Sequence, residues 1–223
     1  MFVLDMDYLK RTGIAAAYRG GKVLQSLFGK ISHVDKKGAI DLVTEADLGS
    51  EKAILECITS RFPDHSILAE ESGLHENPSE FQWIIDPLDG TTNYAHQLPF
   101  FAVSIALSFR GDMLFGTVLN PVSGELFTAT RGEGAHLNGH PIKVSDTQRL
   151  SDSLLVTGFP YNVSEIFETL IFRYGNCMKA ARGIRRLGAA ALDLCYVACG
   201  CFDGYWEQNL KPWDSAAGAL MVA

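Results

Sequence analysis

The stretch WIIDPLDGTTNY, residues 83–94, constrains the fold of this chain more than any other segment. An apolar run typical of a buried strand ends there at two acids, Asp86 and Asp89. Pro87 restricts the backbone between them, so we predict a strand at 83–85 followed by a tight turn. Carboxylates at the end of a buried strand need a partner for their charge.

The segments that precede this stretch predict two helices and a strand. Apolar positions at helical spacing predict a helix over 4–28 with a break at Gly20-Gly21, and a second helix over about 45–61. SILAEES, residues 66–72, reads as a short strand that ends in acids, and 72–80 as a polar loop.

Residues 101–144 have the pattern of an antiparallel meander. The apolar runs FAVSIALSF, MLFGTVLN and ELFTAT are separated by turn residues. Asn138-Gly139 then predicts a further hairpin turn.

The remaining residues alternate between strand-like and helical patterns. We expect a strand at 154–159, helices at about 163–180 and 189–200, a strand at 202–207 and a final helix that begins at WDSAAG. Helices followed by a meander and then by alternating elements predict a mixed α+β layered fold rather than a doubly wound sheet.

The chain has room for one large or two small domains. We expect one compact unit with an N-terminal α+β part, residues 1–150, and a C-terminal α/β part, residues 151–223. Small residues at 215–219 predict a helix surface that packs closely against a partner element. The sequence stops within this helix, so we expect the C-terminal part to be truncated.

Composition excludes several classes of protein. The net charge is −7 and 47% of the residues are hydrophobic, so the chain lacks the basic face expected of a nucleic-acid-binding or membrane-surface protein. No apolar stretch is long enough to span a membrane. The start MFVLDMDYLK does not resemble a secretory signal, and we expect a cytoplasmic protein.

The cysteines and histidines allow two interpretations each. Cys195, Cys199 and Cys201 can ligate a soft metal, but reduced packing thiols are favoured because no paired CxxC spacing is present. His136 and His140 have the spacing of a helical metal pair, yet the intervening Asn-Gly favours a hairpin.

Acids that follow strand-like or turn-like stretches suggest a cation site. Oxygen ligands from loops and strand ends, without histidine or cysteine, suit a hard cation such as Mg²⁺. The Leu88 carbonyl can add a ligand, Gly90 permits close backbone approach, and Thr91-Thr92 would begin a helix whose free N–H groups favour a phosphate. The acids concerned are Glu70, Glu71, Asp86, Asp89 and Asp214.

Two of these patterns have a purely structural alternative. Asp89 can simply cap a helix N-terminus, and spacing alone leaves the two interpretations nearly even. Thr44 and Asp47 match a capping box, which is favoured on spacing alone, although a carboxylate near a threonine hydroxyl can also orient a water.

Four segments of the chain together resemble the inositol monophosphatase family. WIIDPLDGTTNYAHQLPFFAVSIAL resembles its main signature and WDSAAGALMV its C-terminal signature. DLVTEAD, residues 41–47, and ILAEESG, residues 67–73, match the remaining two motifs. The stretch RRLGAAALDLCYVACGCFDGYWEQNLKPWD is similar to the bacterial branch, which includes SuhB-type proteins. The continuation that usually follows the last helix in this family is absent after Ala223.

This resemblance implies a layered αβαβα sandwich, as in inositol monophosphatases and fructose-1,6-bisphosphatases, and a homodimer. It also implies a phosphoric monoester hydrolase that depends on two or three Mg²⁺ ions and is inhibited by Li⁺.

The resemblance also assigns roles residue by residue. Glu70, Asp86 and the Leu88 carbonyl would bind the first ion. Asp86, Asp89 and Asp214 would bind the second ion, and Glu70 would also bind a weaker third ion. Asp47 and Thr91 would polarise the attacking water, which favours the catalytic interpretation of Asp47. Gly90 and Thr91 would bind the phosphate, and Asp89, Gly188, Ala190, Glu207 and Asp214 would contact the substrate's hydroxyls.

The substrate implied first is myo-inositol 1-phosphate or a similar sugar or polyol phosphate. Relatives that hydrolyse fructose 1,6-bisphosphate, other sugar phosphates, histidinol phosphate or 3′-phosphoadenosine nucleotides keep those alternatives open. A role of another class is a SuhB-like protein-binding function in RNA metabolism. Arg182, Arg185 and Arg186 could serve as its interface, although the interpretation as a solvated or dimer-contacting loop is favoured.

Overall fold

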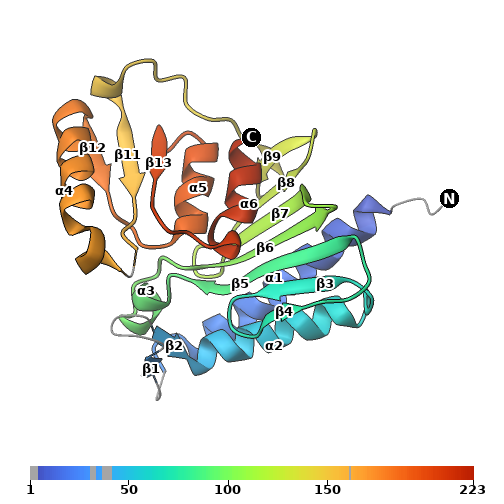
Figure 1. Cartoon of the computed structure of the whole chain (residues 1–223). Helices are drawn as coiled ribbons and strands as arrows, with labels where there is room; N and C mark the ends of the chain where they lie inside the picture. Colours follow the sequence, from blue (N-terminus) through green and yellow to red (C-terminus); the bar gives the residue numbers. More distant parts are fainter. Residues whose placement is uncertain (1–4, 31–33, 37–41, 161) are drawn as a thin grey trace.

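The computed structural model describes residues 5–30, 34–36, 42–160 and 162–223, and they form five layers. A helix pair, α1 and α2, covers one face of a large sheet, and α5 and α6 cover the other (Figure 1). A small sheet lies beyond α5, and α4 packs on its outer side. The helices are α1 (Met6–Leu27), α2 (Glu45–Thr59), α3 (Thr91–Ala95), α4 (Val163–Ala180), α5 (Ala190–Ala198) and α6 (Pro212–Val222), with a 3₁₀ turn at Leu150–Asp152.

The large sheet contains the predicted meander. Its strand order is β10-β9-β8-β7-β6-β5-β3-β4, and every neighbouring pair is antiparallel except β3 and β5, which are parallel. The predicted loop at 72–80 contains a short edge strand, β4. The strands are β3 (Ser66–Ala69), β4 (Gly73–His75), β5 (Phe81–Asp89), β6 (Ala102–Phe109), β7 (Asp112–Asn120), β8 (Glu125–Thr130), β9 (Gly134–Leu137) and β10 (His140–Pro141).

The small sheet is parallel, with the order β12-β11-β13. β11 (Leu154–Thr157) and β13 (Gly204–Trp206) lie within the predicted strands, whereas β12 (Gly183–Arg185) was not predicted. A strand of three residues is too short to show a period-two pattern, which explains why β12 and β4 gave no signal. A separate antiparallel pair, β1 (Val34–Lys36) and β2 (Leu42–Thr44), precedes α2. The mixed α+β layered fold is confirmed.

The central strand β5 separates two hydrophobic cores. Trp83 and Ile85 are fully buried in the core shared with α1 and α2, whereas Ile84 belongs to the core shared with α5 and α6. Alternate side chains of a strand point to opposite faces, so β5 is apolar on both sides. Its acids, Asp86 and Asp89, lie at the end of the strand.

The predicted break at Gly20-Gly21 is wrong, because α1 runs through both glycines. Both residues are buried, and a Cβ at Gly20 would lie 2.7 Å from Ser50 Oγ and from Ile54 Cδ1 of α2. A Cβ at Gly21 would lie 2.9 Å from Leu119 of β7. The glycines therefore allow close packing of α1 on α2 and on the sheet, which offsets their low helix propensity.

The prediction of a tight turn at Pro87 is also wrong, because a β-bulge lies there. β5 continues to Asp89, and its register against β6 shifts between Asp86, which pairs with Ser104, and Asp89, which pairs with Ala102. Three steps along β5 thus oppose two along β6, which defines a β-bulge. Ser50 Oγ of α2 donates to the Pro87 carbonyl at 2.8 Å and so anchors the bulge to α2.

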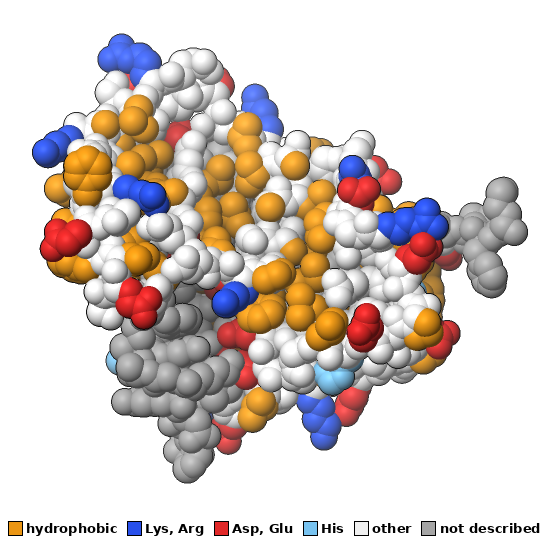
Figure 2. All heavy atoms as spheres, in the orientation of Figure 1, with side chains coloured by type: hydrophobic (Ala, Val, Ile, Leu, Met, Phe, Trp, Pro, Cys, Tyr) orange, Lys and Arg blue, Asp and Glu red, His pale blue; other side chains and the backbone are white. Residues whose placement is uncertain are grey.

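The outer helix α4 has little of its surface covered. Only Leu170 is buried, whereas Phe172 is 70% exposed and Phe167, Ile171 and Met178 are also exposed. Hydrophobic side chains accordingly gather on the surface over α4 (Figure 2). Among the described residues, no helix combines the length and the apolar character required to cross a membrane.

We predict that Gly20→Ala destabilises the protein by about 1–3 kcal/mol, because the new methyl group displaces Ser50 and Ile54. Urea unfolding measures this effect. Gly175→Ala in α4 is the matched control, since a Cβ there would have nothing within 4 Å of it. The control should be neutral or stabilising by up to about 1 kcal/mol through helix propensity. Equal effects of the two substitutions would contradict the close-packing role of Gly20.

Candidate functional site

A cavity of about 610 Å³ opens where β5 ends and where α3, α5 and α6 begin. The site residues predicted from the sequence line it, except Asp47 and Glu71. Asp47 is hydrogen-bonded to Thr91 of the cavity, whereas the Glu71 N–H donates to Glu51 Oε2 at 2.9 Å. The predicted residues that line the cavity are Glu70, Asp86, Leu88, Asp89, Gly90, Thr91, Gly188, Ala190, Glu207 and Asp214.

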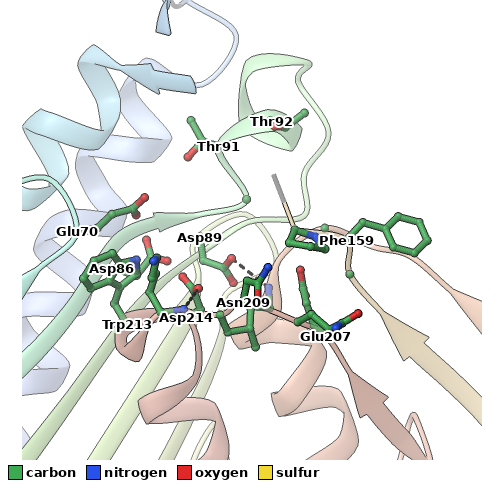
Figure 3. A pocket seen from close by; sticks show the side chains of 18 of the residues that line it. Glu70, Asp86, Asp89, Thr91, Thr92, Phe159, Glu207, Asn209, Trp213 and Asp214 are labelled. Atoms are coloured by element: carbon green, nitrogen blue, oxygen red, sulfur yellow. Dashed lines mark hydrogen bonds between the residues drawn. The ribbon is translucent and has the colours of Figure 1, made fainter. Parts of the chain in front are cut away.

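Strand direction brings the acids together. β3 and β5 are parallel, so Glu70, which follows β3, emerges beside the acids at the end of β5. The Glu70 N–H donates to the Ile85 carbonyl at 3.1 Å and holds the two segments in register. Asp214 comes from the first turn of α6, which packs on the same strands. Figure 3 shows Asp86, Asp89 and Asp214 close together, with Glu70 beside them.

Burial and mutual repulsion raise the pKa values of these carboxyls. Asp86 is 3% exposed, and burial followed by repulsion from Glu70, Asp89 and Asp214 raises its pKa well above the usual range. The side-chain interaction with Glu70 raises the pKa of Asp86 further. Burial and the charge of Asp214 raise the pKa of Asp89 to about 8. Without a cation the cluster therefore retains protons, which a bound cation would replace.

The donor set fits Mg²⁺. Every candidate ligand is an oxygen, which hard cations prefer. Within the described residues, no three His, Cys, Asp or Glu side chains already converge on one ion position. Mg²⁺ keeps several waters and is held by one or two carboxylates together with substrate phosphate oxygens, so acids distributed along a cavity suit it better than a closed cage.

Asp89 caps a helix and also lines the cavity. Its carboxylate accepts from the N–H groups of Ala190 at 3.0 Å and Ala191 at 2.8 Å, at the start of α5. It therefore caps a helix distant in sequence rather than α3, which follows it directly. These N–H donors favour the charged form and partly oppose the rise in the Asp89 pKa.

Asp47 likewise serves the capping box and the site. Its Oδ2 accepts from the Thr44 N–H at 2.8 Å and the Thr44 hydroxyl at 2.6 Å, while the Thr44 hydroxyl accepts from the Ala46 N–H. Its Oδ1 lies 3.0 Å from the Thr91 hydroxyl, which is also 3.1 Å from the Leu88 carbonyl. Burial raises the pKa of Asp47, and the threonine hydrogen bonds oppose this rise.

The opposite wall of the cavity is formed by the loop after β13 and by the residues before α5. Glu207 is half-buried, and the Tyr205 hydroxyl donates to its Oε2 at 2.6 Å. Burial raises the pKa of Glu207, while Tyr205 and the positive charge of Arg186 lower it. Gly188 has a φ of +88° and lies against Asn93, whose side-chain amide donates to the Leu187 carbonyl at 2.8 Å.

Comparison with known proteins agrees with this geometry. Residues 5–223 match the profile of the inositol monophosphatase family. This chain belongs to that family. An inositol-1-monophosphatase of Synechocystis sp. is 48% identical over 98% of this chain and 77% of its own length. The Nus factor SuhB of Pasteurella multocida is 42% identical over 97% of this chain and 82% of its own length. The crystal structure of the suhB protein of Bartonella henselae superposes with a TM-score of 0.93 at 43% identity, covering 96% of this chain and 84% of that one.

Inositol monophosphatases are generally metal-dependent, in agreement with the donor set described above. The family resemblance stated from sequence motifs is therefore confirmed. The roles of the individual residues remain predictions.

Sequence reasoning missed several residues of the cavity. Arg186 lines it, and so does Lys211, whose backbone N–H donates to Asp214 Oδ2 at 2.6 Å. The position of Lys211 three residues before Asp214 resembles the spacing of a capping box, a signal that could have been used. The residues after β11 also contribute, and the sequence predicted only a strand over 154–159 there, without a role in the cavity; they are Gly158, Phe159, Pro160 and Asn162.

Asp193 of α5 was also missed. It is fully buried, and neither oxygen of its carboxyl has a hydrogen-bond partner among the described residues. Burial, followed by the charges of Asp89 and Glu207, raises its pKa to about 8, and Arg186 partly opposes this. The carboxyl therefore carries a proton over most of the pH range in which an ordinary aspartate is charged.

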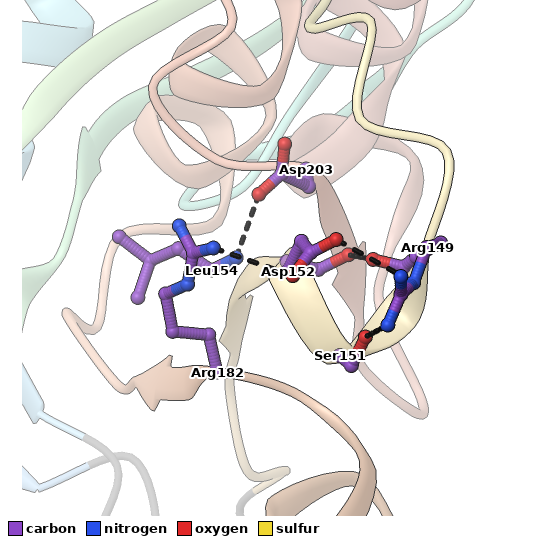
Figure 4. A network of polar contacts seen from close by, with 7 residues as sticks. Arg149, Ser151, Asp152, Leu154, Arg182 and Asp203 are labelled. Atoms are coloured by element: carbon purple, nitrogen blue, oxygen red, sulfur yellow. Dashed lines mark hydrogen bonds and ion pairs between the residues drawn. The ribbon is translucent and has the colours of Figure 1, made fainter.

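The three arginines proposed as an interface do not form one patch. Arg182 lies 3.4 Å from Asp152, which also pairs with Arg149 (Figure 4). Arg185 is exposed and donates to the carbonyl of its neighbour Ile184, whereas Arg186 faces the cavity.

The histidine and cysteine patterns can be assessed as well. His136 and His140 lie on β9 and β10, on either side of a hairpin turn, so the hairpin interpretation is confirmed. Cys195 is buried in the core with α6, as expected of a packing thiol. All five cysteines are free, and Cys199 and Cys201 are neighbours.

We predict that Asp193→Asn stabilises the protein by about 1–3 kcal/mol at pH 8, because it removes a buried carboxyl without partners. The folded pKa of Asp193 is raised, so its contribution to stability is largest below the unfolded pKa and is lost as the pH rises toward 8. The advantage of the variant should therefore shrink at pH 5. Urea unfolding with a chelator at both pH values measures it.

Asp47→Asn is the control for this experiment. Its carboxylate has three hydrogen-bond donors, so the substitution should destabilise the protein at both pH values. A stability difference between Asp193→Asn and wild type that does not depend on pH would contradict the raised pKa.

Proposed function

We propose that this chain is a Mg²⁺-dependent phosphomonoesterase that hydrolyses myo-inositol 1-phosphate or a similar sugar or polyol phosphate. One observation carries the proposal. Buried carboxylates that repel one another line the same cavity as the N-terminus of α3, which favours an anion. A cavity that attracts both cations and phosphate suits metal-assisted hydrolysis of a phosphate ester.

The metal ligands follow from the acids and from one carbonyl. A first ion would be held by Glu70, Asp86 and the Leu88 carbonyl, a second by Asp86, Asp89 and Asp214, and a weaker third by Glu70. The Leu88 N–H donates to Asp86 Oδ1 at 3.0 Å, which orients this carboxyl within the bulge. Bound Mg²⁺ lowers the pKa of a coordinated water and neutralises negative charge on the phosphate.

The attacking water would be oriented by the chain's own pair of Asp47 and Thr91. The Thr91 hydroxyl has one proton, which it donates to Asp47 Oδ1 or to the Leu88 carbonyl, so its lone pairs can accept a hydrogen bond from a water. Because Thr44 fixes the other oxygen of Asp47, the pair needs little rearrangement. We expect direct in-line attack by this water without a phosphoenzyme.

The phosphate would be held by the backbone. Gly90, with a φ of +93°, precedes α3, and a side chain there would crowd the Gly188 and Phe100 carbonyls. The N–H groups of Gly90 and Thr91 lie at the beginning of the helix, where N–H groups have no intrahelical acceptor. These groups would bind phosphate oxygens while leaving the ester oxygen turned toward Glu207.

The remainder of the substrate would contact the wall that contains Glu207. Glu207, with Asp89 and Asp214, offers oxygens that accept hydrogen bonds from ring hydroxyls, while Gly188 and Ala190 limit the width of the cavity. Myo-inositol 1-phosphate is our first choice. Fructose 1,6-bisphosphate, other sugar phosphates, histidinol phosphate and 3′-phosphoadenosine nucleotides are the alternatives to be assayed beside it.

We also propose a homodimer, in which a second copy covers the exposed hydrophobic residues of α4. The alternative function is a protein-binding role like that named in the SuhB relatives. It receives less support, because the arginines expected to serve it are separated, with Arg182 paired to Asp152 and Arg186 in the cavity.

We predict that Asp86→Asn lowers kcat/KM for myo-inositol 1-phosphate by at least about 100-fold, because it removes the carboxylate shared by the two ions. Phosphate release at saturating Mg²⁺, with and without Li⁺, measures the loss. Asp112→Asn is the control, since Asp112 is exposed and pairs with Arg131 on the surface.

Stability measurements separate a catalytic loss from misfolding. Without metal, Asp86→Asn should be at least as stable as wild type, because a buried and repelled carboxyl has been removed. Mg²⁺ should raise the melting temperature of wild type and not that of the variant. Unchanged turnover by Asp86→Asn, or no release by wild type from any ester in the panel, would overturn the proposal.

We further predict that Glu207→Gln reduces kcat/KM for myo-inositol 1-phosphate by about 5–30-fold, the equivalent of one lost charge-assisted hydrogen bond. The same variant should hydrolyse p-nitrophenyl phosphate, which has no ring hydroxyls, at a nearly normal rate. Parallel steady-state assays measure both effects. An equal reduction of kcat/KM for the two esters would show that Glu207 does not recognise the ring hydroxyls of the substrate.

A further inference from the structure

We propose that Cys199 and Cys201 form an oxidisable dithiol, a modification site that closes reversibly into an intramolecular disulfide. The two Sγ atoms lie 3.5 Å apart, and the thiol of Cys199 donates to the sulfur of Cys201. The site lies at the end of α5 opposite to the Asp89 cap and is independent of the proposed hydrolase function.

The turn between the two cysteines keeps the sulfurs together. Gly200 has a φ of +76°, a conformation that allows the chain to reverse directly after the helix. The Cys199 N–H donates to the Cys195 carbonyl at 3.0 Å, and the Cys201 N–H donates to the Tyr196 carbonyl at 2.9 Å. Both cysteine backbones are therefore anchored to the last turn of α5.

Neighbouring segments hold this turn from outside. A Cβ at Gly200 would lie 3.2 Å from the Ser145 nitrogen, so the turn packs against that segment. The Asp203 carboxylate accepts from the Ser145 hydroxyl and from the Leu154 N–H, both at 2.6 Å (Figure 4). A held turn gives the two thiols a high effective concentration, which favours ring closure over reaction with another molecule.

The two sulfurs have different roles. Cys201 is exposed, and its sulfur accepts the hydrogen bond, so it is the sulfur that an oxidant reaches first. Cys199 is partly buried, and burial and the neighbouring Cys201 raise its pKa to about 11, so it keeps its proton until the second step. Cys57 and Cys195 are fully buried and inaccessible to the oxidant.

The reaction needs a two-electron oxidant, for which we take hydrogen peroxide. The Cys201 thiolate attacks one peroxide oxygen, the O–O bond breaks, and hydroxide leaves as Cys201 becomes a sulfenic acid. The Cys199 sulfur then attacks the Cys201 sulfur, the S–O bond breaks, and water leaves. In total two thiols lose two electrons and two protons, and one peroxide becomes two waters. A dithiol reductant reverses the change.

The test is peroxide treatment of the whole chain, followed by alkylation of the unfolded protein and peptide mass analysis. We expect two thiols, those of Cys199 and Cys201, to become inaccessible to alkylation together and to be restored by dithiothreitol. Cys201→Ser should slow the loss of thiols at least tenfold, whereas Cys177→Ser, a change at a partly exposed cysteine elsewhere, should leave the rate unchanged.

A second variant tests the order of the two steps. Cys199→Ser removes the resolving thiol, so peroxide should leave a sulfenic acid at Cys201 that reacts with dimedone, and wild type should show little of this adduct. Alkylation of both cysteines at the untreated level after peroxide would overturn the proposal. Oxidation confined to Cys177, or an intermolecular disulfide in place of the internal one, would overturn it as well.

Discussion

Buried carboxylates that repel one another are the constraint on which the rest of this structure depends. The parallel pairing of β3 and β5 brings Glu70 beside Asp86, and β5 continues through a bulge to Asp89, which lines the same cavity. Such charges are costly to bury unless donors or cations balance them. The surrounding elements supply the donors, and the cavity leaves space for the cations.

The donors come from the residues at the beginning of three helices. Asp89 accepts from the first N–H groups of α5, Asp214 accepts from the residue before α6, and Asp47 closes the capping box of α2. Each acid thereby fixes the start of a helix and also faces or supports the site. A single substitution among them therefore alters both local structure and chemistry, which is why the proposed experiments measure stability beside activity.

Sequence patterns predicted most of the helices and the meander, because these elements are long enough to show a period. The exceptions have local physical reasons. Gly20-Gly21 indicated a break, but close packing on α2 keeps α1 continuous. Pro87 indicated a turn, but pairing with β6 absorbs the extra residue as a bulge. The strands β4 and β12 have three residues each and are too short for their pattern to be read.

For the site, the sequence by itself indicated which kinds of side chain to expect. Its acids at strand ends, the Gly-Thr-Thr and the family motifs named ten of the residues that line the cavity. Only the tertiary structure decided which of these residues lie close together and which further residues surround them. It showed that Asp89 caps α5 rather than α3, that Arg186 faces the cavity, and that the carboxyl of Asp193 is buried without a partner. These facts depend on contacts between segments about a hundred residues apart, and no local pattern encodes such contacts because packing selects them only when the whole chain has folded.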